Sequence, residues 1–189
     1  MPASVLVTWA TRYGSTEEVA HAVADELLRR RFSVNAQPMT GVTSIDRYDA
    51  VVLGFALYMG SIHKDARRFI ATHRTQLTQR PVALFALGPV HAEESEFVEA
   101  RRELAKELAK FPWLAPAAQE VFGGRFDPRK LGFPLILFPP LRKMPASDAR
   151  DWTAIHAWAG NLTPLLQPAM AHQSPFANSA RPEPRYSGL

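Results

Sequence analysis

The stretch TWATRYGSTEEVAHAVADELLRRR, residues 8–31, decides the fold because it passes from a strand-like apolar run, through a short polar turn, into a long helical pattern. The run ASVLVTW at residues 3–9 predicts a buried strand. From Thr16 to Arg31, apolar residues recur at helical spacing on one face. A strand that leads directly into an amphipathic helix predicts the first unit of an α/β fold.

The rest of the chain repeats this alternation of apolar runs and amphipathic segments. Further strands are predicted at residues 32–38, 48–56, 81–88 and 117–124, and further helices at 64–79, 94–111 and 148–166. Continuous apolar strands separated by such helices are typical of a parallel sheet that is covered on both faces. We therefore predict one α/β domain over residues 1–167, a doubly wound five-stranded parallel sheet with helices on both faces.

Composition and charge exclude some classes of protein and make others unexpected. The 189 residues are 47% hydrophobic and 21% charged, as in ordinary globular domains. The absence of cysteine excludes disulfides and thiolate metal sites, and fits a cytoplasmic protein. The net charge is +4, but the basic residues are scattered without an aromatic pattern, so nucleic-acid binding is not expected. We also expect no metal site, no secretory signal and no membrane-spanning segment.

The turn between the first strand and the first helix carries the clearest chemical signal. Ligands of doubly wound sheets bind beyond the carboxyl ends of the strands, which points to the loops at 10–16, 55–63 and 88–94. In the first loop, Thr11, Ser15 and Thr16 offer hydroxyls, and the helix N-terminus offers unpaired N–H groups. These features predict a phosphate site, although Ser15 or Thr16 could simply be the N-cap of the helix. Neither a Walker loop nor a GxGxxG fingerprint is present.

This first loop resembles the FMN-phosphate loop of the flavodoxins, whose pattern is roughly [ST]-x-[ST]-G-x-[ST]. The matching residues are Thr11, Arg12, Tyr13, Gly14, Ser15 and Thr16. Tyr13 replaces the middle hydroxyl of the pattern, and the Arg12 fork matches phosphate oxygens. The resemblance implies a flavodoxin-like fold that binds FMN through these six residues.

Two later loops extend the resemblance. The stretch YDAVVLGFALYMGSIHKDARRF, residues 48–69, is similar to the second flavin loop of the flavodoxin-like family, and ALGPVHAEE, residues 86–94, lies where the third loop is expected. The likeness implies that Tyr58 or Met59 packs on the flavin ring and that residues of both loops border it. The implied ring contacts are Ala56, Leu57, Tyr58, Met59, Gly60, Leu87, Gly88, Pro89, Val90 and His91.

Two histidines follow these loops and are candidate catalytic residues. Imidazoles of His63 or His91 close to the flavin could move protons during two-electron transfer. Structural or solvent-facing roles for both histidines are the alternative.

Within the flavodoxin-like family, the chain resembles the branch that contains the bacterial menaquinone-dependent protoporphyrinogen dehydrogenases. The basic charge is unlike the acidic electron carriers of the family, and residues 126–145 form an insertion between the last strand and the last helix. Its apolar part, 131–143 with the basic flank, could contact a membrane surface or an apolar substrate, act as a lid, form a homodimer contact, or pack on its own core. Residues 168–189 are Pro-rich and predict a disordered tail.

The leading functional hypothesis is therefore an FMN-dependent oxidoreductase with a quinone or small-molecule acceptor, of which a protoporphyrinogen IX dehydrogenase is one form. The alternatives are a flavodoxin-type electron carrier that docks a redox partner and a flavin-free binding module. A cytoplasmic location, with peripheral contact at the inner face of the membrane, accompanies the leading hypothesis.

Overall fold

A computed structural model describes residues 2–58, 60–130 and 145–167 of the chain. Its centre is a sheet of five parallel strands in the spatial order β2-β1-β3-β5-β6. These strands are β1 (Ser4–Ala10), β2 (Ser33–Pro38), β3 (Ala50–Tyr58), β5 (Val82–Leu87) and β6 (Ala118–Phe122). Counted in chain order, this arrangement is 2-1-3-4-5, which is the flavodoxin-like doubly wound order. The predicted fold class is confirmed.

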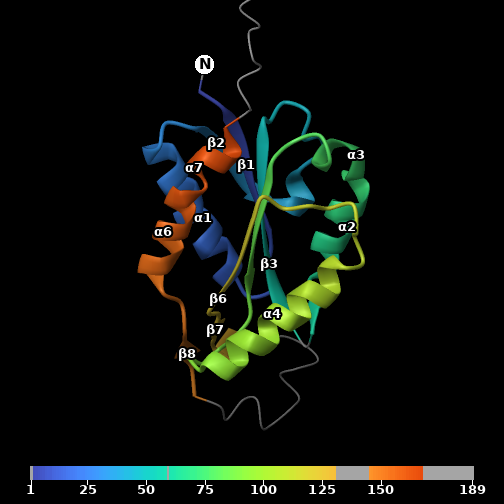
Figure 1. The fold of residues 1–189 in the computed structure, drawn as a ribbon. Coiled ribbons are helices and arrows are strands. Elements are labelled where there is room, and N and C mark those ends of the chain that lie inside the picture. The colour runs from blue at the N-terminus through green and yellow to red at the C-terminus, as the bar shows by residue number, and fades with distance from the viewer. Residues whose placement is uncertain (1, 59, 131–144, 168–189) are drawn as a thin grey trace, which may run out of the picture.

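Helices cover both faces of the sheet, as Figure 1 shows. One layer holds α1 (Ser15–Arg29), α6 (Trp152–Asn161) and α7 (Thr163–Leu166), and the other holds α2 (Lys64–Thr72), α3 (Arg74–Leu77) and α4 (Glu94–Leu108). The 3-10 turns η1 (Met39–Gly41) and η2 (Pro128–Lys130) complete the helical elements among the described residues. Among those same residues, no helix is both long and apolar enough to cross a membrane.

Two hydrophobic cores, one on each face, hold these layers to the sheet. Alternate residues of β1 point to opposite faces, so Val5 and Val7 pack with α1 and α6 whereas Leu6 packs with the α2 and α4 layer. Both faces of the central strands are therefore buried, which is why their sequences are continuous apolar runs without alternation.

Two predicted helices differ from the observed ones. The segment 64–79 is divided at His73, which ends α2 and precedes α3. Leu77 stays in the same core as Phe69 and Ile70, so the apolar spacing continues across the break and does not reveal it. The segment 148–166 contains the strand residue Asp148 and then two helices, α6 and α7, that meet at Leu162.

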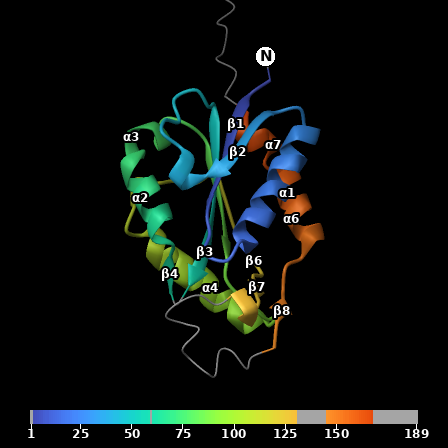
Figure 2. The same ribbon diagram turned by 180° about the vertical axis from the view of Figure 1, so that it is seen from behind.

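A small ribbon lies between the last strand of the sheet and α6. Strand β7 (Arg125–Phe126) pairs antiparallel with β8 (Ser147–Asp148). The two described segments before and after residues 131–144 therefore lie side by side. Arg150, whose side chain is 3% exposed, donates to Asp148 and to Glu18 of α1, each at 2.6 Å. Figure 2 shows the ribbon at the end of the molecule where α1 begins. The predicted membrane, lid or dimer contact at 131–143 and the predicted tail at 168–189 lie outside the described residues.

Candidate functional site

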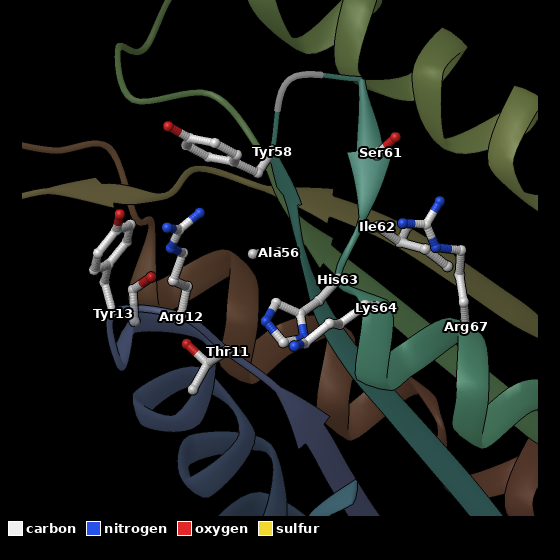
Figure 3. A pocket seen from close by; sticks show the side chains of 11 residues that line it. Thr11, Arg12, Tyr13, Ala56, Tyr58, Ser61, Ile62, His63, Lys64 and Arg67 are labelled. Carbon is white, nitrogen blue, oxygen red and sulfur yellow. The ribbon is translucent and has the colours of Figure 1, made fainter. Parts of the chain in front are cut away.

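A cavity of about 520 Å³ opens at the carboxyl ends of β1 and β3, between the first loop and the hairpin that follows β3. Its volume falls in the range of small-molecule sites. Figure 3 shows its lining side chains. The lining residues are Thr11, Arg12, Tyr13, Ser15, Ala56, Tyr58, Ser61, Ile62, His63, Lys64 and Arg67.

The first loop presents an open helix N-terminus to this cavity. Helix α1 begins after Gly14, whose φ of 91° lies in the left-handed region that glycine adopts without strain. The Gly14 N–H donates to Thr11 Oγ1 at 3.0 Å, which leaves the Thr11 hydroxyl proton available to another acceptor. No side chain caps the helix, so the first N–H groups of α1 have no side-chain acceptor in the described structure. Such an end suits an anion.

Two hydroxyls of the loop are buried without a hydrogen-bond partner among the described residues. Thr16 is fully buried and its Oγ1 makes no hydrogen bond, and the Tyr13 hydroxyl is likewise unpartnered. The alternative that Ser15 or Thr16 acts as the N-cap is wrong, because the N-cap is Gly14 and neither hydroxyl caps α1. Tyr13 lines the cavity, whereas Gly14 and Thr16 are not among its lining residues. Buried polar groups are normally satisfied, so orphaned donors beside an uncapped helix fit a phosphate ligand.

The second loop is a tight hairpin. Strand β4 (Ser61–Ile62) pairs antiparallel with the end of β3, with Tyr58 opposite Ser61. Gly60 has a φ of 74°, and a Cβ there would meet Glu103 Oε1 at 3.2 Å, so the turn requires glycine. The hairpin directs Tyr58 into the cavity wall while Leu57 faces the core. Met59, also predicted as a ring contact, lies outside the described residues.

Arg12 bridges the two loops. Its guanidinium carbon lies 5.5 Å from the centroid of the Tyr13 ring and 5.7 Å from that of Tyr58, within the range of cation–π attraction. Partial burial raises the pKa of Tyr58 above its ordinary value. The aromatic surface predicted for a flat ring and the cation predicted for a phosphate therefore lie at one cavity.

His63 lines the cavity and also caps α2. Its Nδ1 accepts a hydrogen bond from the Asp65 N–H at 3.3 Å. In the neutral imidazole, an accepting Nδ1 places the proton on Nε2. In the neutral imidazole the cap therefore favours the tautomer with its proton on Nε2, although the same Nδ1 also lies 3.5 Å from Asp65 Oδ2.

Four lining residues were not predicted from the sequence: Ser61, Ile62, Lys64 and Arg67. They line the cavity because the β3–β4 hairpin turns the chain back, so that the first turns of α2 face the first loop. Arg67 also approaches Glu107 of α4, with 3.9 Å between Nη1 and Oε2. Glu107 is buried and pairs with Lys110 as well.

The third loop lies apart from this cavity, since none of Leu87, Gly88, Pro89, Val90 and His91 lines it. Leu87 is buried in the α1 and α6 core. A Cβ on Gly88 would lie 3.1 Å from the Ala100 Cβ of α4, so this glycine allows close packing. His91 Nδ1 lies 2.9 Å from Glu96 Oε1. The hydrogen bond between these two side chains lowers the pKa of Glu96. Ring contacts and catalysis by this loop stay predictions.

Comparison with known proteins agrees with the fold. The flavodoxin domain family matches residues 6–134, which include both loops of the cavity. The chain is 22% identical, over 171 residues, to the protein named protoporphyrinogen IX dehydrogenase [quinone] of Escherichia coli strain K12, covering 85% of this chain and 94% of that protein.

Solved structures show the same fold. Oxidised flavodoxin 1 from Bacillus cereus superposes with a TM-score of 0.57 at 14% identity, covering 87% of this chain and all of that one. Oxidised flavodoxin 2 from the same organism gives 0.53 at 19% identity, covering 87% and 97%. At these identities the likeness concerns the fold alone.

Proposed function

Because the chain belongs to the flavodoxin domain family, we propose that it binds FMN in the cavity between the first loop and the β3–β4 hairpin, and that it is an FMN-dependent oxidoreductase. The observation that carries the proposal is the uncapped N-terminus of α1 beside the buried, unpartnered hydroxyl of Thr16. An FMN phosphate would satisfy both. Family membership supports the same cofactor.

Different residues of the first loop would bind the phosphate from different sides. The N–H groups of α1 and the Thr16 hydroxyl would donate from the helix side, and the Thr11 hydroxyl, fixed by Gly14, would donate from the strand side. Arg12 adds a positive charge at the same place, with a fork that suits phosphate oxygens.

The second loop would flank the flavin and handle protons. FMN supplies the electron-transfer chemistry when it is bound. Tyr58 offers an aromatic face and excludes water, and His63 holds a proton at Nε2 that its cap of α2 keeps directed away from the helix. His63 is therefore the stronger of the two catalytic candidates, since His91 pairs with Glu96 and does not line the cavity.

An organic reductant and a quinone are the proposed partners of the flavin. The name of the Escherichia coli relative contains both protoporphyrinogen IX and a quinone, and the similarity extends over most of both chains. The net charge of +4 also favours an anionic reactant over the role of an acidic electron carrier. A carrier that docks an acidic redox partner is the second candidate function.

The test begins with flavin binding. The purified protein is mixed with FMN, freed of unbound ligand and examined by absorption. We expect flavin bands in the wild type and their loss in the double variant Gly14→Val, Thr16→Ala. A wild type that retains no flavin would overturn the oxidoreductase proposal and leave a flavin-free binding module.

Turnover separates the enzyme from the carrier. With FMN bound and oxygen excluded, the protein should oxidise protoporphyrinogen and reduce a soluble naphthoquinone over many catalytic cycles. Absence of turnover, together with fast and strongly salt-dependent electron exchange with an acidic redox protein, would favour the carrier.

A further inference from the structure

Lys64 is placed where it weakens its own helix. It is the first residue of α2, and a cation at a helix N-terminus opposes the helix dipole. The neighbouring positions follow the usual preference, because His63 caps the helix and Asp65 puts a negative charge in its first turn. A residue that breaks a local rule beside a binding cavity points to a role in binding.

Lys64 and Arg12 line the same cavity. Within residues 2–58, 60–130 and 145–167, no carboxylate oxygen lies within 4.0 Å of either side-chain cation. Arg67, by contrast, shares the buried Glu107 with Lys110. In Figure 3 Lys64 lies beside His63, across the cavity from Thr11 and Arg12, whereas Arg67 stands apart, farther along α2.

The charge of these two side chains matches that of a phosphate monoester. Such a group carries about −1.5 to −2 at neutral pH, and Arg12 and Lys64 together carry two positive charges. The first loop also offers one small hydroxyl fewer than the flavodoxin-like pattern that it resembles, because Tyr13 stands in its middle position. A second cation from α2 would replace that missing donor.

We propose that Lys64 is a phosphate-binding residue of this protein, and that with Arg12 it makes the cavity select FMN over riboflavin, the same flavin without the phosphate. The proposal rests on the proposed FMN site and adds to it a cation from outside the first loop. It also gives a reason for the lysine at the first position of α2, where a cation opposes the helix dipole.

Parallel titrations with FMN and riboflavin, followed by flavin fluorescence, test the role of Lys64. In Lys64→Gln we expect the dissociation constant for FMN to rise about tenfold or more, as for a lost charge-assisted hydrogen bond, with riboflavin affinity unchanged. Lys64→Arg should keep most of the affinity for FMN. The FMN difference between Lys64→Gln and wild type should shrink when the salt rises from about 0.05 M to about 0.5 M.

Lys106→Gln is the matched control, since Lys106 is an exposed residue of α4 that does not line the cavity and its loss changes the net charge equally. It should leave both affinities unchanged. The melting temperature of flavin-free Lys64→Gln should equal or exceed that of the wild type, so a folding defect is recognised separately.

Equal losses for FMN and riboflavin in Lys64→Gln, or no loss for either, would overturn the role of Lys64 while wild-type FMN binding still supports the proposed function. A wild type that binds neither flavin overturns both. An equal loss of FMN affinity in Lys106→Gln would show that only net charge matters, and would also refute the assignment.

Discussion

Helices α1 and α6 lie in the same layer and pack in the same core, yet they satisfy their N-termini in opposite ways. At α6 the Asp151 carboxylate accepts from the Ala154 N–H at 3.0 Å, so the helix supplies its own anion. At α1 no side chain among the described residues does this, although Ser15 and Thr16 stand in the first turn. Helix α2 is intermediate, since its cap is the imidazole of His63. A capped end contributes stability, whereas an uncapped end beside a cavity is available for a ligand.

The largest effect is expected for His63, which caps α2 and is also the proposed proton donor. His63→Asn keeps a side-chain acceptor for the Asp65 N–H but removes the titratable proton. Turnover of the FMN-loaded protein should fall about 100-fold, as for a lost general acid, while the free energy of unfolding stays near the wild-type value. Steady-state rates and urea unfolding measure the two quantities.

His63→Ala is the companion variant. It should lose both turnover and about 0.5–1 kcal/mol of unfolding free energy, because the cap is gone. Full turnover in His63→Asn would refute the proton role and leave a purely structural cap.

The next effect concerns α1. Thr16→Val keeps the shape of the buried side chain and removes its hydroxyl. FMN affinity should fall about 10-fold or more for the lost hydrogen bond to phosphate, measured by fluorescence titration. The flavin-free protein should be no less stable, because the hydroxyl is unpartnered in the described structure. A loss of about 1 kcal/mol without FMN would mean that Thr16 caps the helix after all.

At α6, removal of the N-cap Asp151 should affect stability and not FMN binding. Asp151→Ala should lower the free energy of unfolding by about 1 kcal/mol because it removes the N-cap of α6. FMN affinity should not change, since Asp151 does not line the cavity. Urea unfolding with and without FMN checks both statements, and a weakened FMN complex would contradict the division between the two helices.

The smallest effect lies at the opposite end of α2, where His73 is buried against Phe69. Burial lowers the pKa of His73 below its ordinary value of 6.5. The folded protein then binds fewer protons than the unfolded chain below that pH, so stability decreases as the pH falls through 6.5 toward the lowered pKa. Urea unfolding at neutral and mildly acidic pH should show a smaller decrease in His73→Gln than in wild type. Equal decreases would mean that other groups cause it.

The sequence predicted the sheet well because burial on both faces leaves a continuous apolar run in each strand. It predicted the first loop because hydroxyls, a glycine and a helix start are adjacent in the chain. It did not predict Lys64 or Arg67 as lining residues, since their position depends on the two-residue strand β4 and its glycine turn. The lysine at the start of an amphipathic segment was the available signal. The break at His73 was invisible because both pieces of the helix bury the same face.

The β7–β8 ribbon has a consequence for how this chain can diverge. Pairing of Arg125 with Asp148, and the link from Arg150 to Glu18, fix the two points between which residues 127–146 run. Closing a chain between two fixed points costs little more free energy as the connection grows, about 0.6 kcal/mol for each doubling of the length of a flexible loop. Selection can therefore change the length of the connection between β7 and β8 while the sheet and the helices that cover it stay the same.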